Sequence, residues 1–594
     1  MEEIRQNAER RNQDGKEAVQ QAFTGATVVT KYNQKTYKID RVDFAQSPET
    51  TFDKQGTQTS YKEYYKTRYN EEIKNANQPL LINKDRRTGA EVALIPELCQ
   101  LTGLTDSMRA DFRLMQDLAK IVHTNAEAKI KEIKNLMNHF KTNEKCVEKQ
   151  KLWHLKFNEN PQQLEGFKYQ AGRLLMGPNA SGTPNSFDIE QCAREIDRKI
   201  QGKMFTQTQL KDWCIFHGDR DGQVANQFKS TMKECLDTCG YDKTEPRMCE
   251  VKPAMRVDNW IKALKAQLKA GVQMVVLLLP GQKGKCQHYD DVKKFLLTEF
   301  PVPSQVVLVG TIQKGKNLRS IVSKVLIQMN AKVGGIPWAV DGLPFMSEPT
   351  MICGMDVFHS TSLGKKSVLA LTASTNQSAT TYWSTSVIQD EIGQEGSTTL
   401  QNGMINALES FKKHNGTYPA RVIFYRDGVG EGQVQGICVP EIEQIKASIA
   451  AVGRQDATKL MYINTCKRVN TRVFDGVVGN FKNPMAGTVI DSCVTDKDVY
   501  EFYLVSVAAR QGMSTPTRFT VLYDSIGTSP DQIEQLTYKL CYTYYNVSGA
   551  IKEPSCIRYA HRLAALVGER GGKQQGPPVI SPEFEKRDPC LYFI

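Results

Sequence analysis

The sequence predicts a multidomain α/β protein. Its 594 residues exceed what a single hydrophobic core usually organises, so we expect about three to five domains. The apolar share of 40% and the charged share of 24% are ordinary for folded proteins. Short strands dominate residues 25–105, helices dominate residues 106–187, and strands alternate with helices over residues 188–594. This order indicates separate domains, with helices packed on the faces of mixed sheets in the later ones.

The composition narrows the range of partners and compartments. Lysine and arginine exceed aspartate and glutamate by 12, which suits a polyanionic partner such as nucleic acid. No run of about 18 apolar residues occurs, so we predict no membrane span. The 15 cysteines include no C-x-x-C pair, which indicates reduced thiols in a cytosolic or nuclear protein. His217, Cys235, Cys239 and Cys249 could form a zinc set, but their spacing favours free buried thiols.

Residues 1–24 read as a polar helical linker, and residues 25–105 as a small β module. The strand patterns are Thr27–Tyr32, Thr36–Asp40, Pro79–Asn83 and Val92–Pro96, the last two flanking a basic loop. Between the second and third of these strands, the segment Tyr61–Tyr69 interleaves four tyrosines with three basic residues. Such a mixture suits stacking on unpaired bases and holding phosphates. The alternative is a helical stripe of Tyr61, Tyr65 and Tyr69 that simply packs, and spacing alone slightly favours it.

Residues 106–187 read as a helical connector, and residues 188–340 as an α/β domain. In the latter, the strand Val272–Leu279, a helix over 289–298 and the strand Gln305–Val309 form a βαβ unit. Tyr289 and Lys293 are four residues apart, as are Gln328 and Lys332, so each pair is adjacent on its helix. The two pairs could converge on a phosphate, although ordinary surface polarity explains each pair equally well.

Residues 341–594 contain two strands that each carry an aspartate. Met351–His359 carries Asp356, and Val422–Asp427 ends at Asp427, where a glycine-rich turn begins. Asp427 alone would more often start a turn than bind a ligand. Two strand-borne carboxylates together predict a divalent-metal site, and metal-assisted phosphodiester cleavage needs such oxygen ligands at strand ends.

Several motifs together resemble the Argonaute family, and their variants resemble its PIWI clade. They are Gly354-Met-Asp-Val-Phe-His359, Tyr425-Arg-Asp-Gly-Val-Gly-Glu-Gly-Gln433, Lys467-Arg-Val-Asn-Thr-Arg472, Leu540-Cys-Tyr-Thr-Tyr-Tyr-Asn546, Tyr559-Ala-His561 and Leu591-Tyr-Phe-Ile594. The resemblance implies a β-barrel-like PAZ domain over 25–105, a helical linker over 106–187, a Rossmann-like MID domain over 188–340 and an RNase H-like PIWI domain over 341–594. It also implies that the chain is a piece of a longer protein, without the amino-terminal domain and arginine-rich tail.

The resemblance assigns roles to individual residues of the PIWI domain. The family's catalytic Asp-Glu-Asp-His set falls on Asp356, Glu395, Asp427 and His561, with Glu391 as a rival to Glu395 because the loop carries one extra residue. Asp356, Asp427 and His561 would bind two Mg²⁺ or Mn²⁺ ions.

The resemblance also assigns residues to the two ends of a guide RNA. Its 5′ phosphate would bind Tyr289, Lys293, Gln305, Gln328 and Lys332, with a further divalent ion held by Gln328 and the terminal carboxylate of Ile594. Its 3′ end, usually 2′-O-methylated in this clade, would enter an aromatic pocket formed from Tyr32, Tyr37, Tyr64, Tyr65 and Tyr69.

The resemblance thus implies a piRNA-guided RNA endonuclease that silences transposons. It would cut complementary target RNA by two-metal hydrolysis, leaving a 5′-phosphate and a 3′-hydroxyl. Tudor-domain and slicing-cofactor proteins are the expected partners, and cytoplasmic germ granules the expected location, with the nucleus as the alternative. A guide-loaded platform that silences by recruiting partners is the competing function. A guide-independent nuclease leaves the PAZ-like and MID-like regions unexplained.

Overall fold

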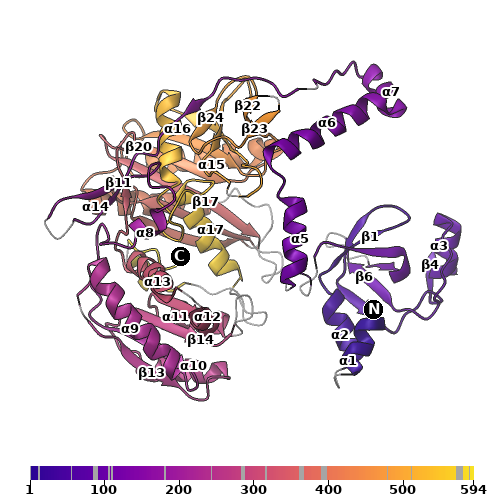
Figure 1. The fold of residues 1–594 in the computed structure, drawn as a ribbon, viewed down its shortest axis with the longest axis horizontal. Helices are drawn as coiled ribbons and strands as arrows, with labels where there is room; N and C mark the ends of the chain where they lie inside the picture. The colour runs from indigo at the N-terminus through magenta and orange to yellow at the C-terminus, as the bar shows by residue number, and fades with distance from the viewer. Residues whose placement is uncertain are drawn as a thin grey trace. The chain divides into compact units, whose positions relative to one another are not determined.

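A computed structural model shows the chain in two units, Met1–Thr124 and Asn125–Ile594 (Figure 1). The structure describes residues 2–10, 14–54, 56–84, 91–104, 108, 111–158, 160–178, 182–242, 244–281, 288–314, 317–359, 367–389, 398–477, 479–509, 511–569, 580–586 and 589–594. Among the described residues, no helix has both the length and the apolar character needed to cross a bilayer.

Short strands form the centre of the first unit. Two three-stranded sheets have the orders β2-β1-β8 and β3-β6-β7, and β4 pairs with β5. Its elements are α1 (Glu2–Glu9), α2 (Gly15–Phe23), β1 (Thr27–Thr30), β2 (Thr36–Lys38), β3 (Arg41–Asp43), β4 (Thr51–Lys54), β5 (Thr57–Ser60), α3 (Tyr61–Tyr69), β6 (Leu80–Lys84), β7 (Glu91–Leu94), β8 (Cys99–Thr102) and α5 (Phe112–Val122). The predicted strand pair is confirmed as β6 and β7. The predicted single polar helix is two, because Asp14 caps a new helix by accepting from Lys16 N and Glu17 N.

Residues 106–187, predicted to be a helical connector, are only partly helical, which corrects our prediction. The elements after α5 are α6 (Ala126–Thr142), α7 (Glu144–Leu152), β9 (Phe167–Lys168), β10 (Arg173–Met176) and β11 (Asn185–Asp188). β10 pairs with β11 and with β16 (Ala339–Val340), and β9 pairs with the edge of a large sheet. Strands this short carry little periodicity of their own, and pairing partners distant in sequence decide their conformation.

The α/β region that follows contains a four-stranded parallel sheet, as predicted. Its order is β13-β12-β14-β15. The elements are α8 (Ile196–Lys199), β12 (Trp213–Gly218), α9 (Gly222–Cys239), β13 (Arg247–Val251), α10 (Val257–Gln267), β14 (Met274–Leu279), α11 (Tyr289–Thr298), β15 (Ser304–Leu308), α12 (Val309–Lys314) and α13 (Leu318–Lys332). All six residues of β14 are buried, which fits a central parallel strand covered on both faces.

A nine-stranded mixed sheet organises the rest of the second unit. Its order is β19-β18-β17-β20-β21-β26-β25-β24-β9, and β17, β20 and β21 run parallel at its centre. The elements are β17 (Thr350–His359), β18 (Ser367–Ser374), β19 (Tyr382–Gln389), α14 (Thr398–Asn415), β20 (Arg421–Asp427), α15 (Val434–Ala451), β21 (Lys459–Cys466), β22 (Asp475–Val477), β23 (Asn480–Lys482), β24 (Thr488–Ile490), β25 (Tyr500–Val505), β26 (Thr517–Asp524), α16 (Pro530–Leu540), α17 (Ser555–Glu569) and α18 (Glu583–Lys586). The prediction of a mixed sheet with helices on its faces is confirmed.

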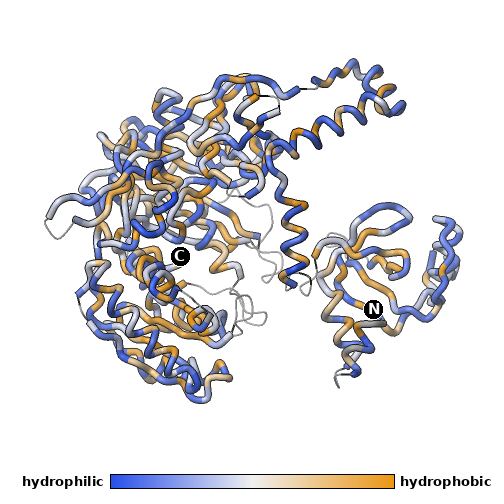
Figure 2. The backbone as a smooth tube through the Cα atoms, in the orientation of Figure 1, coloured by the Kyte–Doolittle hydropathy of each residue, from blue (hydrophilic) through white to orange (hydrophobic). Residues whose placement is uncertain are grey.

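Alternate residues of the central strands enter two different cores. Met351, Cys353 and Met355 of β17 pack in the cluster that includes α14 and α15, whereas Ile352 packs in the cluster that includes α16 and α17. This period of two places one pair of helices on each face of the sheet. Figure 2 shows the resulting contrast between apolar strands of the sheet and the mainly hydrophilic α6 and α7.

Helix α17 lies close to β17 because Gly354 has no side chain. A Cβ atom added at Gly354 would lie 2.3 Å from the carbonyl carbon of Cys556 and 2.5 Å from the backbone nitrogen of Ile557. The hydroxyl of Thr372 on β18 donates to the Cys556 carbonyl at 2.9 Å and fixes the same turn of the helix. The start of α17 is therefore set against the strand that carries Asp356.

We expect Gly354→Ala to lower the free energy of unfolding by about 1–3 kcal/mol or more, because the new methyl group would overlap backbone atoms. Gly436→Ala in α15 is the matched control, since a Cβ there meets nothing within 4 Å. It should leave stability unchanged or raise it by up to about 1 kcal/mol. Urea unfolding followed by circular dichroism compares the two, and equal midpoints would show that α17 does not need the glycine.

Candidate active site

Two carboxylates meet at the carboxyl ends of adjacent parallel strands. The register pairs Met355 of β17 with Arg426 of β20, so the next residues, Asp356 and Asp427, follow side by side. Both are buried, with 7% and 9% of their surface exposed. Gly428 then turns the chain away with a φ of +67°, a conformation that glycine adopts without strain. The sequence pattern therefore places both acids where we expected them.

Helix α17 brings an imidazole to the same place. His561 Nδ1 lies 2.7 Å from Asp356 Oδ2. Ligand atoms of Asp356, Asp427 and His561 all lie within 4.8 Å of one another, and among the described residues this is the one such group of histidine, cysteine, aspartate or glutamate. Cys235, Cys239 and Cys249 form no disulfide, and they do not join His217 in a group of this kind.

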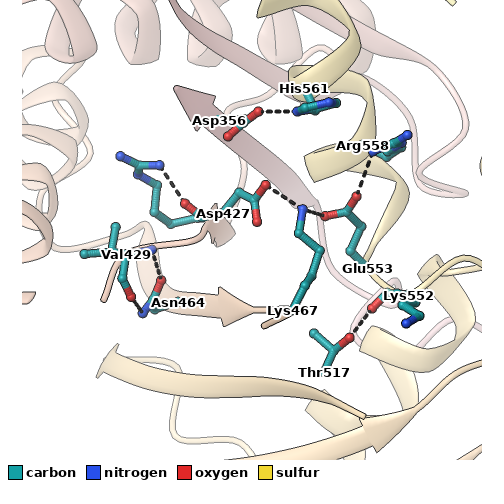
Figure 3. A network of polar contacts seen from close by, with 11 residues as sticks. Asp356, Asp427, Val429, Asn464, Lys467, Thr517, Lys552, Glu553, Arg558 and His561 are labelled. Atoms are coloured by element: carbon teal, nitrogen blue, oxygen red, sulfur yellow. Dashed lines mark hydrogen bonds and ion pairs between the residues drawn. The ribbon is translucent and has the colours of Figure 1, made fainter. Parts of the chain in front are cut away.

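A lysine that the sequence analysis did not single out completes the polar network (Figure 3). Lys467, directly after β21, donates from Nζ to Asp427 Oδ2 at 2.6 Å and to Glu553 Oε2 at 2.6 Å. Glu553 is 3% exposed and also lies 3.7 Å from Arg558 Nη1 through its other oxygen. Lys467 begins one of the motifs that resemble the family. No local pattern marks Glu553, 86 residues later, as its partner.

A buried ion pair between Arg426 and Glu441 holds the backbone at Asp427 in place. Arg426 Nε lies 3.1 Å from Glu441 Oε1, both side chains are nearly inaccessible, and Tyr462 also donates to Glu441. The second branch of the guanidinium, Nη1, donates to the backbone carbonyl of Asp427 at 2.8 Å. The pair thus ties the end of β20 to α15 and fixes the backbone from which the carboxylate projects.

The surroundings of the two aspartates shift their pKa values in opposite directions. Burial is the largest influence on Asp427 and raises its pKa; Lys467 opposes this and Asp356 adds to it, so the pKa stays above its ordinary value. Burial also acts to raise the pKa of Asp356, but the hydrogen bond and charge of His561, with help from Arg426 and Lys467, outweigh it and lower the pKa.

The donor set fits a divalent cation. Asp427 Oδ1 is buried and has no hydrogen-bond partner, so one carboxylate oxygen is left for a ligand that the protein itself does not supply. Carboxylate oxygens suit Mg²⁺ and Mn²⁺, and an imidazole is compatible with Mn²⁺. Asp356, Asp427 and His561 are the residues that would hold the ion. Glu395 and its rival Glu391 lie outside the described residues, so their assignment stays a prediction.

The residues predicted to hold a 5′ phosphate also come together, on α11, β15 and α13. Lys293 Nζ donates to Ser304 O at 2.9 Å, and Lys332 Nζ donates to Ser304 O at 2.9 Å and to Gln305 Oε1 at 2.8 Å. Two more hydrogen bonds extend this network: Gln305 Nε2 donates to Gln328 Oε1, and Gln328 Nε2 donates to Asn546 Oδ1, at 2.9 Å each. Lys293 Nζ also lies 6.0 Å from the centre of the Tyr289 ring.

The charges around Lys332 favour an anion. Burial lowers the pKa of Lys332 well below its ordinary value, and the cations Lys293 and Arg562 lower it further. The acceptors of its hydrogen bonds are neutral oxygens. The chain's last residues pack beside this site, because Leu591 N donates to Ala331 O at 3.1 Å and Ile594 is buried. A metal ion between Gln328 and the Ile594 carboxylate stays a prediction.

Four of the five tyrosines predicted for a 3′-end pocket, Tyr32, Tyr64, Tyr65 and Tyr69, form an aromatic cluster in the first unit. The Tyr32 ring lies 4.4 Å from Tyr69 and 5.1 Å from Tyr65, and Tyr64 lies 5.7 Å from Tyr65, centre to centre. α3 is a helix and Tyr65 is buried in the core, so the packing alternative holds for that residue. Tyr32, Tyr64 and Tyr69 are half-buried, and Tyr37 packs at a neighbouring core.

Comparisons with known proteins agree with this architecture. A family model described as a Piwi domain matches residues 274–570, and one described as a PAZ domain matches residues 1–125. Piwi-like protein 1 of Danio rerio is 35% identical over 561 residues, which cover 93% of this chain and 64% of that protein. The chain therefore spans less than two thirds of the length of this relative.

Solved structures show the same arrangement. The crystal structure of Drosophila Piwi aligns with a TM-score of 0.74 at 27% identity, covering 100% of this chain and 76% of that one. Kluyveromyces polysporus Argonaute with a guide RNA aligns with a TM-score of 0.66 at 17% identity, covering 96% of this chain and 67% of that one, which shows the fold alone. The multidomain PAZ–MID–PIWI architecture is thereby confirmed, while the bounds of individual domains stay predictions.

We expect Glu441→Gln to lower the free energy of unfolding by about 3–5 kcal/mol, because it leaves the buried Arg426 guanidinium without its counter-ion. Glu443→Gln on the same helix is the matched control: its ion pair with Lys446 is largely exposed, so the change should stay within about 1 kcal/mol. Thermal unfolding of both variants measures the difference. Similar melting temperatures would contradict the supporting role of the Arg426–Glu441 pair.

Proposed function

The chain belongs to the Argonaute family, in its PIWI clade, and we propose that it is a guide-dependent endonuclease that cleaves complementary RNA. The observation that carries the proposal is the convergence of Asp356, Asp427 and His561 at the ends of two parallel strands and one helix. The Piwi domain has an RNase H-like fold, in which acids at this edge of the sheet perform phosphodiester hydrolysis.

The proposed chemistry divides between the ion and the side chains. Bound Mg²⁺ or Mn²⁺ would supply an activated water and stabilise the leaving 3′ oxygen, so that the products are a 5′-phosphate and a 3′-hydroxyl. Asp427 offers its unpartnered Oδ1, and Asp356 is held in place by His561. Glu395 is the proposed fourth member of the set. Arg426 and Glu441 keep the end of β20 rigid, which catalysis by preorganised charges requires.

The two ends of the guide have separate proposed sites. Lys293, Gln305, Gln328 and Lys332 would exchange their present hydrogen bonds for bonds to a 5′ phosphate, with Tyr289 stacking on the first base. The half-buried rings of Tyr32, Tyr64 and Tyr69, together with Tyr37 and Tyr65, would receive the 3′ end. Kluyveromyces polysporus Argonaute, which shares the fold, was solved with a guide RNA, the class of ligand that we propose here.

From the resemblance to the PIWI clade, which relatives named Piwi-like support, we propose a piRNA as the guide and transposon silencing in germ cells as the role. Base pairing would select the target, while the protein binds the backbone and the 5′ phosphate. Tudor-domain proteins and a slicing cofactor are further proposed partners, with cytoplasmic germ granules as the proposed location. The competing function is a guide-loaded platform without cleavage, which the cleavage assay below separates from the first.

We expect the chain, loaded with a 5′-phosphorylated guide RNA, to cut a matched target in Mg²⁺ or Mn²⁺. Asp427→Ala should reduce the rate by about 10²–10³-fold or more, because it removes a carboxylate that holds the ion and the developing charge. Denaturing gels of end-labelled target measure the products.

Asp524→Ala is the control for this experiment. Asp524 also ends a strand, but its partner on β21 is Met461, at the opposite end from Thr465, which pairs with Asp427. Absence of cleavage by the unmutated chain would favour the platform. Equal rates for the unmutated chain and Asp427→Ala would contradict the site assignment.

We expect Lys332→Ala to weaken binding of a 5′-phosphorylated guide roughly 10- to 100-fold, the loss of a charge-assisted hydrogen bond to phosphate. Binding of the same guide with a 5′-hydroxyl should change little. Lys324→Ala on the same helix is the control, since Lys324 is half exposed and pairs with Asp197. Filter binding measures the six affinities of the unmutated chain and the two variants for both guides. Equal weakening for both guides in Lys332→Ala would exclude Lys332 as a phosphate ligand.

A further inference from the structure

The Lys467 side chain bridges two carboxylates, and the proposed reaction uses only one of them. Its Nζ atom lies 2.6 Å from Asp427 Oδ2 and 2.6 Å from Glu553 Oε2 (Figure 3). Asp427 belongs to the proposed ion site, whereas Glu553 lies just before α17 and outside the group of three ligands. Glu553 is 3% exposed, and a charge so deeply buried is costly unless it is paired. Lys467 is its partner in an ion pair.

An ammonium group this close to Asp427 opposes a divalent cation in two ways. It occupies one of the two oxygens of the carboxylate. It also adds a positive charge beside the position of the ion, where two like charges repel each other more strongly than in bulk water. A lysine paired with Asp427 alone would therefore weaken the site that the strands assemble.

Glu553 changes this balance. It gives the ammonium a second anchor at the same distance as the first, and the Lys467–Glu553 pair carries no net charge. Arg558 does not replace Lys467 in this role, because it is 3.7 Å from the other oxygen of Glu553 and its side chain is 38% exposed. Asp427 keeps its second oxygen, Oδ1, without a protein partner.

We infer that Glu553 is a positioning residue that neutralises and anchors Lys467. In this arrangement Lys467 fixes the Asp427 carboxylate through Oδ2. Because the charge of Glu553 balances the ammonium charge, Lys467 does not lower the affinity of Oδ1 for a divalent cation. The inference rests on the proposed function for the identity of the ion site. It concerns the affinity for the ion, which is measurable without RNA and without cleavage.

The test is Mn²⁺ binding by the full chain, with free Mn²⁺ measured by electron paramagnetic resonance. Only binding that Asp427→Asn removes is counted. We expect Glu553→Gln to weaken this binding on the order of tenfold, because Lys467 is left with Asp427 alone. Lys467→Met should bind Mn²⁺ at least as tightly as the unmutated chain, because a competing cation is gone. The double variant should recover the affinity that Glu553→Gln loses.

Three outcomes would overturn the inference. Unchanged affinity in Glu553→Gln would show that Glu553 has no influence on the ion. A double variant as weak as Glu553→Gln would show that Glu553 acts on the ion directly, as a ligand, and not through Lys467. An unmutated chain without Asp427-dependent Mn²⁺ binding would leave nothing for Glu553 to tune.

A matched control separates this effect from general destabilisation. Glu534→Gln also removes a buried carboxylate, one whose partners are the hydroxyls of Tyr169 and Tyr500 rather than a cation. Its Mn²⁺ affinity should equal that of the unmutated chain. Recovery by Lys467→Met cannot come from refolding a damaged protein by chance, so the double variant keeps the test decisive if Glu553→Gln melts early. Failure of guide-dependent cleavage with this pattern of Mn²⁺ binding intact would contradict the proposed function and leave the inference standing.

Discussion

The close approach of α17 to β17 at Gly354 is the constraint on which the site depends. A side chain at Gly354 would overlap the backbone of Cys556 and Ile557, the first turn of the helix. From that fixed start, the helix carries His561 to within 2.7 Å of Asp356, two residues beyond the glycine on the strand. The two elements are buried together, so packing energy, rather than the hydrogen bond itself, holds the imidazole against the acid.

Local sequence patterns predicted those parts of the site that lie on single strands. Asp356 directly follows a run of apolar residues, and Asp427 follows another after one arginine, Arg426. Their strands are adjacent and parallel, which brings the two acids together. His561 could not be found this way, because a histidine on a helix carries no sign of the strand it will contact; only the family motif identified it. Glu553 had neither signal. Its pairing with Lys467 depends on where the turn before α17 meets the end of β21, which is a property of the whole domain.

The connector shows the same division between local and distant information. α5 and α6 were predictable because apolar residues recur at helical spacing over several turns. β9, β10 and β11 were not, because each has two to four residues and gains its hydrogen bonds from partners elsewhere in the chain. The hydrogen-bond network around Lys332 was predictable only in part. The spacing put Gln328 and Lys332 on one face of α13. Their acceptors Asn546 and Ser304 come from other parts of the chain, which the spacing does not reveal.

One helix relates the two charged sites of the second unit. His561 faces the acids at the sheet edge, whereas the next residue, Arg562, acts electrostatically on Lys332 in the basic site. Consecutive helical residues project about 100° apart, so α17 can present one side chain to each site. The sites suit ligands of opposite charge: carboxylates suit divalent cations, and lysines suit an anionic phosphate. A ligand that supplies phosphate to one site and divalent ions to the other would satisfy both, and a 5′-phosphorylated nucleic acid with its metal ions has that charge pattern. The rigid placement of α17 against β17 would then set the geometry of both sites at once.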